Sequence, residues 1–282
     1  MNTTNQLPNL RPCLSTQAAA QLAQTLYGLT ATAQELPSER DQNFHLQASA
    51  GQEFVLKISG TAEQEAVLDF QNKAIAHLTT VAEELPCPRV WTTTSGELIA
   101  RVAGVNGATH FVRLLTFVPG KPLALVKPHA PELLRNLGAY LGGMDRALST
   151  FDHPATHRTL HWDLKHASSV IRQHKDKISD PARRLLVEQL LAHFEQTVAP
   201  RLKDLRTGVI HNDGNDYNVI VGDDQARGLL GRSKVIAGVI DFGDMVHTYT
   251  VNEVAIAAAY VMLDKVDPVT AAAQVVGGYH AV

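Results

Sequence analysis

Alternating apolar and polar residues, the pattern of half-buried strands, recur along the first part of the chain. Helical spacing of apolar residues over Thr61–Val81 predicts one helix there, and Ser15 or Thr16 is expected to cap another that reaches Tyr27. The sequence therefore predicts a strand-rich lobe after an N-terminal arm at Met1–Leu14. Its strands are expected at Thr30–Leu36, Asn43–Ala48, Glu53–Ser59, Arg89–Thr93, Leu98–Val102 and Phe111–Phe117.

Helical spacing dominates after Val118–Pro122, where two prolines and a glycine mark a candidate domain junction. We therefore expect an α+β chain of two lobes, a strand-rich lobe over residues 1–117 and a helix-rich lobe over residues 118–282. The helices of the second lobe are expected at Ala130–Leu148, Pro181–Val198, Val251–Leu263 and Pro268–Val276.

One polar loop lies between the β-branched runs Val209–Ile210 and Val219–Val221. It contains His211, Asp213 and Asn218 in the order H-x-D-x-x-x-x-N. In a kinase catalytic loop of this order, the Asp accepts the proton of the substrate hydroxyl and the Asn binds magnesium. A second apolar run, Val239–Ile240, ends in the carboxylate Asp241. Asp213 is therefore the candidate base, and Asn218 and Asp241 are candidate Mg²⁺ ligands.

Phosphoryl transfer also needs a cation on the nucleotide phosphates, and Lys57 is the candidate. It lies inside an apolar strand, where an unpaired ammonium is costly, unless that strand is an edge with the lysine in water. Gln71 interrupts the apolar stripe of the Thr61–Val81 helix and is predicted to aim Lys57 at the phosphates. Glu65 and Asp69 are rival partners, and Gln71 could instead bond to backbone at the rim of the core.

Composition limits the class of protein. The chain has 282 residues, 45% hydrophobic and 19% charged, which is typical of a globular protein. Its formal net charge of −3 gives no indication of nucleic-acid binding. The two cysteines lie far apart in the sequence, and no apolar run is long enough for a signal peptide or a membrane span. We expect a cytoplasmic protein without membrane or nucleic-acid partners.

At this point the chain resembles the aminoglycoside phosphotransferase and choline kinase superfamily, whose fold is protein-kinase-like. The residues that carry the resemblance are VLKI around Lys57, PCPRV, LLTFVPGKPL, VIHNDGNDYNVIV and VIDFGD. The segments SERDQNF, HWDLKHAS and HNDGNDYNV are most similar to the hydroxylysine kinase branch. The resemblance extends from about Leu26 to the last residue. Related modules sometimes precede a class III aminotransferase domain, so a fused or partner aminotransferase is expected.

The resemblance implies a role for each matching position. Asp213 would be the catalytic base, Asn218 and Asp241 would bind Mg²⁺, and His211 would brace the loop. Lys57 would contact the ATP phosphates with Gln71 at the place of its helix partner. The backbone of Leu115–Phe117 would bind adenine, and Ser38–Asn43 would replace the glycine-rich loop.

Three departures from the family pattern affect these roles. The segment SERDQN has no glycine, so side chains such as Ser38 are expected to replace the backbone cradle for phosphates. Gln71 stands where many relatives have an acidic residue, and an amide can orient Lys57 but cannot neutralise it. Relatives usually continue beyond the position of Val282 with further helices, so we expect a chain that is short at its C-terminal end.

The resemblance implies an ATP- and Mg²⁺-dependent transferase, a small-molecule kinase that phosphorylates a hydroxyl of an amino alcohol or hydroxy amino acid. The surplus carboxylates Asp163, Asp216 and Asp244 are expected to bind the ammonium group of such an acceptor. Two alternatives stay open. One is a non-catalytic kinase-like module that binds nucleotide and regulates an attached or partner enzyme. The other is a metal hydrolase that uses His211, Asp213 and Asp241, although a second histidine at ligand spacing is missing.

Overall fold

The structure of the protein is a computed structural model that describes residues 11–104, 107–223 and 233–282. The first ten residues of the predicted arm therefore lie outside the described residues. The chain divides into two compact units, Met1–Gly120 and Lys121–Val282. The assignment of residues 1–117 and 118–282 to a nucleotide-binding lobe and a catalytic lobe stays a prediction.

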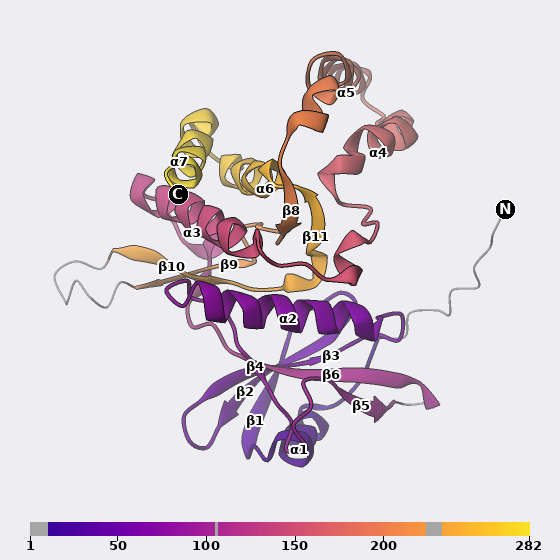
Figure 1. Ribbon diagram of the computed structural model, residues 1–282, viewed down its shortest axis with the longest axis vertical. Helices are drawn as coiled ribbons and strands as arrows, with labels where there is room; N and C mark the ends of the chain where they lie inside the picture. Colours follow the sequence, from indigo (N-terminus) through magenta and orange to yellow (C-terminus); the bar gives the residue numbers. More distant parts are fainter. Residues whose placement is uncertain (1–10, 105–106, 224–232) are drawn as a thin grey trace. The chain divides into compact units, whose positions relative to one another are not determined.

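An antiparallel sheet forms the framework of the first unit (Figure 1). β3 lies between β2 and β6, so the interpretation of Lys57 as an edge-strand residue is wrong. The strands follow the order β1-β2-β3-β6-β4, and β5 also pairs with β6. Their bounds are β1 Ala31–Leu36, β2 Gln42–Ala48, β3 Glu53–Ile58, β4 Val90–Trp91, β5 Ala100–Ala103 and β6 Thr109–Thr116.

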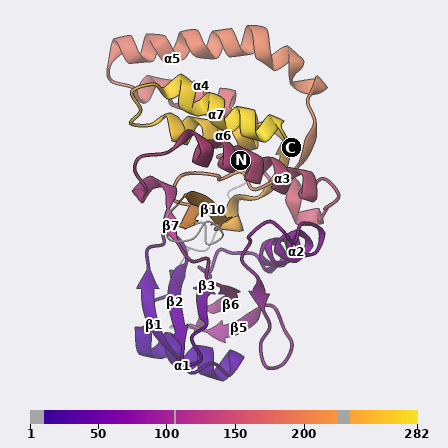
Figure 2. The ribbon, with the colours of Figure 1, turned by 90° about the vertical axis from the view of Figure 1, so that its left-hand side faces the viewer.

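Helix α1 (Thr16–Tyr27) and helix α2 (Glu65–Val81) cover opposite faces of this sheet (Figure 2). Ser15 caps α1 as expected, because its side chain accepts a hydrogen bond from the Ala18 N–H. The α1 face is an apolar core in which Tyr27 packs with Phe44, Leu56 and other alternate residues of the strands. The intervening strand residues, Lys57 among them, therefore face the α2 side.

The second unit combines short strands with helices. β9 (Val219–Asp223) pairs with β10 (Lys234–Val239) and β7 (Lys121–Pro122), while β8 (Thr207–Ile210) pairs with β11 (Val246–Tyr249). Helix α3 (Pro131–Leu148) packs against α7 (Pro268–His280), and α6 (Val251–Met262) packs beside them. A side chain at Gly138 would collide with the Val275 carbonyl oxygen, which lies 1.9 Å from the position of its first carbon atom. Glycine therefore permits the close approach of α3 and α7.

Two helices of this unit are more exposed. Helix α5 (Pro181–His193) lies apart from α3 in Figures 1 and 2, and Leu191 is its buried residue. The helix predicted to reach Val198 changes to a wider π turn at Phe194–Val198. Helix α4 (Ala167–His174) was not predicted, because it is short and none of its residues is buried. Within the described ranges, we find no helix long and apolar enough to span a membrane.

Candidate active site

The loop between β8 and β9 holds the predicted base in a fixed orientation. Oδ1 of Asp213 accepts a hydrogen bond from Nδ2 of Asn215 at 2.8 Å, and Oδ2 accepts one from Nδ2 of Asn218 at 2.7 Å. Asn218 Nδ2 also donates to the Asp213 carbonyl oxygen at 3.0 Å. Each carboxylate oxygen of this half-buried side chain keeps acceptor capacity beyond these bonds. The geometry suits a carboxylate that receives a proton from a hydroxyl.

The electrostatic setting of Asp213 favours a proton acceptor. The pKa of its carboxyl is raised to about 6, chiefly by burial and also by the negative charges of Asp244 and Asp241. Hydrogen bonds from Asn215 and Asn218 act in the opposite direction. A carboxyl with a raised pKa is a stronger base than an ordinary exposed aspartate, as general-base chemistry near neutral pH requires.

The β9–β10 ladder brings Asn218 and Asp241 together. Val219 pairs with Val239, and the Ile240 N–H donates to the Asn218 carbonyl oxygen at 2.9 Å. Asp241 follows directly in the left-handed region with φ 61°, and its Oδ1 accepts from the Gly243 N–H at 3.3 Å. A non-glycine residue in this region carries strain, which is common where a side chain must be aimed at a functional site.

The residues around Asp213 fit a hard divalent cation. The side-chain Nδ2 of Asn218 donates to Asp213, so the side-chain oxygen Oδ1 of Asn218 points away from Asp213. This amide oxygen and the carboxylate of Asp241 are the ligand type that Mg²⁺ prefers. Across the described ranges, no three His, Cys, Asp or Glu side chains gather into a metal cluster of their own. The oxygens of a bound phosphate would have to complete the coordination.

His211 braces the loop from inside the unit. Its side chain is buried, and its Nδ1 accepts a hydrogen bond from the Asp213 N–H at 3.3 Å. The other ring nitrogen, Nε2, must then carry the proton and donate to the Ile240 carbonyl oxygen at 3.1 Å. Burial lowers the pKa of His211 to about 4, so the ring is neutral at physiological pH. His211 therefore ties the loop to the segment before Asp241.

Glu253, which the sequence did not single out, holds the same loop from α6. Its Oε2 accepts a hydrogen bond from the Asn212 N–H at 2.9 Å, and Gly214 packs against its other oxygen. Burial raises the pKa of Glu253 to about 7. Burial also raises the pKa of Asp145 on α3, and the negative charge of Glu253 raises it as well. Tyr279 on α7 donates to Oδ2 of Asp145 at 2.6 Å. Three helices thus converge beneath the base.

Arg158 is a second residue that the sequence reasoning missed. Its guanidinium donates to the Gly243 carbonyl oxygen at 2.5 Å and to that of Met245 at 2.7 Å. Gly243 lies within the single 3₁₀ turn Phe242–Asp244 that follows Asp241, and Met245 is the residue that ends it. A cation at the carbonyl end of a turn satisfies acceptors that the turn itself leaves unpaired. Arg158 therefore fixes the segment that carries both Asp241 and Asp244.

In the first unit, Lys57 belongs to a polar row across the sheet. Asn43 on β2 lies directly opposite Lys57, and Lys57 lies directly opposite Arg113 on β6. Residues paired in this way share one face of an antiparallel sheet. Oδ1 of Asn43 is buried and has no hydrogen-bond partner among the described residues. The two cations on this face suit an anionic ligand, whereas the Asn43 oxygen would need a hydrogen-bond donor.

Gln71 contacts Arg113 through its side chain. Its Oε1 accepts a hydrogen bond from Nη2 of Arg113 at 2.8 Å, and Asn72 accepts one from Nη1 at 2.9 Å. The rival partners proposed for Lys57 have ion pairs of their own, Asp69 with Lys73 and Glu65 with Arg101. The partner of Lys57 stays a prediction. A charged residue inside the apolar run FVRLL was the signal that could have found Arg113.

The remaining residues that were predicted to bind the nucleotide lie at the end of β6 and in the turn between β1 and β2. Leu115 is in β6, while the Thr116 and Phe117 N–H groups donate to the Arg89 and Glu53 carbonyl oxygens. An adenine bound at Leu115–Phe117 would therefore have to use other backbone groups of this segment. Ser38 lies half-buried in the turn between β1 and β2, the position at which the resemblance puts the phosphate-covering loop.

Comparison with known families decides the classification. The family model described as "Phosphotransferase enzyme family" matches residues 32–281, which is most of the chain. The chain belongs to this family. It is accordingly a phosphotransferase.

Curated relatives of this phosphotransferase include hydroxylysine kinases. The one from Mus musculus is 30% identical over 96% of this chain and 76% of its own length. The one from Danio rerio is 31% identical over 96% of this chain and 77% of its own length. The predicted resemblance to the aminoglycoside phosphotransferase family and its hydroxylysine kinase branch is confirmed.

Solved structures extend the likeness at the level of the fold. A microcompartment-associated aminopropanol kinase has a TM-score of 0.71 and 17% identity, and the match covers 94% of this phosphotransferase and 80% of that chain. An amicoumacin kinase in complex with AMP-PNP and Ca²⁺ has a TM-score of 0.68 and 17% identity over 95% and 78% of the two chains. The predicted α+β, protein-kinase-like fold is thereby confirmed.

Proposed function

We propose that this phosphotransferase uses Mg²⁺-ATP to phosphorylate a hydroxyl group of an amino alcohol or hydroxy amino acid. The observation that carries the proposal is the held carboxylate of Asp213, which two amides orient and two further carboxylates surround. Hydroxylysine kinases among the relatives support the acceptor class, because hydroxylysine bears both an ammonium and a hydroxyl group. An attached or partner aminotransferase domain stays a prediction.

Asp213 acts as the base in the proposed reaction. Its carboxylate accepts the proton of the acceptor hydroxyl while the hydroxyl oxygen forms a bond to the γ-phosphorus. The bond from that phosphorus to the bridging oxygen of ADP breaks, and ADP leaves with the electron pair. Asn215 and Asn218 keep the carboxylate aligned throughout, and His211 and Glu253 keep the loop backbone in place.

Asn218 and Asp241 are the proposed ligands of Mg²⁺, and Lys57 is the proposed contact of the ATP phosphates. Bound Mg²⁺ would supply neutralisation of the phosphate oxygens and of the crowded carboxylates. The two cations Lys57 and Arg113, which lie side by side on that face of the sheet, support an anionic ligand there. Ser38, Gln71 and the Leu115–Phe117 backbone remain proposed nucleotide contacts.

An ammonium group on the acceptor would be attracted by the surplus carboxylates. Asp163 is buried, and its Oδ1 already accepts from the Thr248 hydroxyl at 2.8 Å and the Lys165 N–H at 3.0 Å. We therefore favour Asp244 and Asp216, which are half-buried and follow the two catalytic segments. Asp244→Asn and Asp216→Asn should raise the KM of an amino alcohol and leave the KM of ATP unchanged. An equal rise in both constants would remove this role.

The decisive experiment combines a substrate screen with one substitution. ADP release is measured with amino alcohols, hydroxy amino acids and aminoglycosides, and the best acceptor is then used for kinetics. Asp213→Asn should lower kcat by roughly 10²- to 10⁴-fold, the usual contribution of a general base, and should retain Mg²⁺-ATP binding. Asp223→Asn, at the exposed end of β9 where it pairs with Lys234, is the matched control. Full activity of Asp213→Asn, or turnover without ATP, would refute the proposal.

A further inference from the structure

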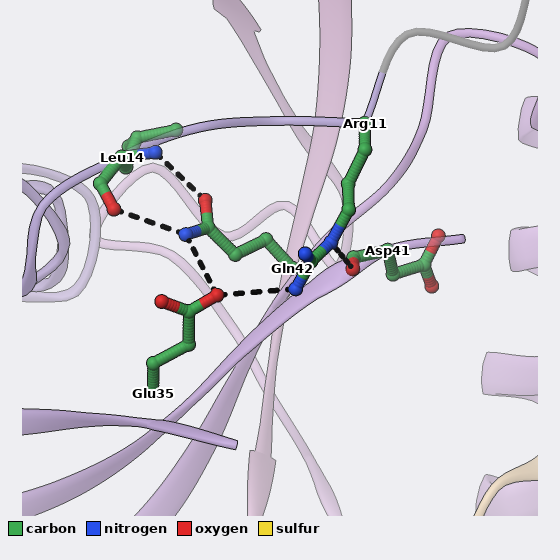
Figure 3. A network of polar contacts seen from close by, with 5 residues as sticks. All are labelled: Arg11, Leu14, Glu35, Asp41 and Gln42. Carbon is green, nitrogen blue, oxygen red and sulfur yellow. Dashed lines mark hydrogen bonds and ion pairs between the residues drawn. The ribbon is translucent and has the colours of Figure 1, made fainter. Parts of the chain in front are cut away.

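The turn between β1 and β2 is held by side chains from outside the sheet. It covers Pro37–Asp41, and it contains no glycine. Figure 3 shows that segment Arg11–Leu14, which precedes α1, lies against the start of β2 and is joined to it by several hydrogen bonds. We call Arg11–Leu14 the strap.

Gln42, the first residue of β2, makes the central contact with the strap. Its Oε1 accepts from the Leu14 N–H at 2.8 Å, and its Nε2 donates to the Leu14 carbonyl oxygen at 3.0 Å. Nε2 also donates to Oε1 of Glu35 on β1 at 3.1 Å. Gln42 is only 3% exposed, so these partners satisfy an amide that would otherwise be costly to bury. One side chain therefore joins the strap to both strands that flank the turn.

Two further contacts fix the last residue of the turn. Nε of Arg11 donates to the Asp41 carbonyl oxygen at 3.0 Å, and its guanidinium pairs with Glu35 at 3.1 Å. From the other side, Oδ1 of Asp41 accepts from the Gly60 N–H, which follows β3, at 3.2 Å. Asp41 is thus held by the strap through its backbone (Figure 3) and by the segment after β3 through its side chain.

We propose that the strap positions the Pro37–Asp41 turn for the phosphates of the nucleotide, with Gln42 as the positioning residue. This inference rests on the proposed function, because it takes Ser38–Asn43 as the phosphate-covering segment. A glycine-rich loop can adapt its backbone to phosphates, whereas a turn without glycine must be held in its binding conformation beforehand. The strap supplies that constraint. The affinity for the nucleotide therefore depends on residues that are distant in sequence from the turn.

The test measures the Kd of Mg²⁺-ATP for the full chain by titration calorimetry, without any acceptor. Gln42→Glu places a negative charge against the Leu14 carbonyl oxygen and Glu35, and Arg11→Ala removes the bond to Asp41. Each variant should raise the Kd by about five- to tenfold, as expected when one or two hydrogen bonds are lost. Gln47→Glu, an exposed glutamine on the same strand, is the matched control and should leave the Kd unchanged.

Two deletions locate the effect, and kinetics separate positioning from general damage. Removal of residues 1–14 should match Gln42→Glu, while removal of residues 1–10 should not change the Kd. In the active enzyme, the KM of ATP should rise and the KM of the acceptor should stay within about twofold. Equal changes in both constants, with a lower melting temperature, would indicate a merely structural role and overturn the proposal.

The outcomes also separate this inference from the proposed function. Wild-type protein that fails to bind Mg²⁺-ATP would overturn both. Wild-type binding that Gln42→Glu and Arg11→Ala leave unchanged would overturn the strap alone. Weaker nucleotide binding by both variants, together with no transfer to any hydroxyl acceptor, would support the strap and refute the proposed acceptor. If the chain without residues 1–14 fails to fold, the two point variants decide the question.

Discussion

Asn212 adopts a left-handed backbone conformation with φ 64° immediately before the proposed base. Its N–H donates to Glu253, but both polar atoms of its own side chain are buried without a hydrogen-bond partner in the described part of the chain. Asn212 therefore stabilises the loop through its backbone N–H, and its side-chain amide contributes no hydrogen bond. An unsatisfied buried amide usually lowers stability.

Asn212→Gly should stabilise the protein. Glycine adopts a positive φ without strain and removes two unsatisfied polar atoms, which outweighs its greater flexibility in the unfolded chain. We expect a gain of about 1 kcal/mol, or roughly 2–4 °C in Tm for a chain of this size. Asn212→Ala is the matched variant, since it removes the same atoms but carries a Cβ into the left-handed region. A Tm of Asn212→Gly below those of wild type and Asn212→Ala would contradict this account.

The sequence revealed some residues of the candidate site more readily than others. His211, Asp213 and Asn218 lie within eight positions, so their spacing alone indicated a catalytic loop. Glu253 and Arg158 bind backbone atoms of distant segments, and no local pattern marks such a contact. Arg113 could have been found by the argument that singled out Lys57, because both are charged residues inside apolar strands.

At the scale of elements, α3, α6 and α7 meet at buried acidic groups beneath the catalytic loop. Asp145 and Glu253 each have one oxygen that is buried without a hydrogen-bond partner in the described ranges, and the negative charge of Glu253 raises the pKa of Asp145. Protonation of Glu253 would remove the negative charge that opposes ionisation of Asp145. The amphipathic patterns predicted these helices well, but their polar contacts interrupt the apolar faces and could not be read from periodicity.

This pair predicts a dependence of stability on pH. The pKa of Glu253 is raised in the folded state from 4.5 to about 7, so the folded protein binds this proton more tightly than the unfolded chain. The stabilisation is complete below the unfolded pKa and declines as pH rises towards the folded pKa. Urea unfolding at about pH 5 and about pH 8 should show a smaller loss in Glu253→Gln than in wild type. Identical losses would show that Glu253 does not titrate in this range.

A prediction for the turn after β10 concerns Arg158. Without its guanidinium, the Gly243 and Met245 carbonyls lose their donor and the turn that carries Asp241 becomes mobile. Arg158→Ala should raise the Mg²⁺ concentration needed for half-maximal activity by about five- to tenfold. Millimolar guanidinium should bring the Mg²⁺ requirement of Arg158→Ala partly back to the wild-type value. Arg158→Lys should keep a raised requirement, because an ammonium cannot reproduce the planar fork of a guanidinium.

The control for this experiment is Arg172→Ala, which removes an ion pair with Glu195 near α4. It should leave the Mg²⁺ requirement unchanged. Arg158→Ala with a normal Mg²⁺ requirement but a lower Tm would mean that Arg158 stabilises the unit without positioning Asp241.

For the molecule as a whole, the two compact units carry different parts of the proposed chemistry. Lys57, Gln71 and the Pro37–Asp41 turn belong to Met1–Gly120, and Asp213, Asn218 and Asp241 belong to Lys121–Val282. The sequence predicted a junction at Val118–Pro122, because strand-like alternation gives way there to helical spacing. The short strands β7 and β11 have too few residues to show a period, and they were found only in the structure.

Mg²⁺-ATP should raise the melting temperature of the protein. Ligand at about 100 times its Kd adds about 2.7 kcal/mol, which for this size of chain corresponds to roughly 5–10 °C. Asp241→Ala should abolish the part of the shift that requires Mg²⁺. Asp264→Ala is a matched control, since Asp264 is also a left-handed aspartate, with φ 57°, but is exposed after α6. A Mg²⁺-dependent shift that survives in Asp241→Ala, or that is equally lost in Asp264→Ala, would exclude Asp241 as the metal ligand. Only the variant that lacks a ligand of the ion should lose this shift.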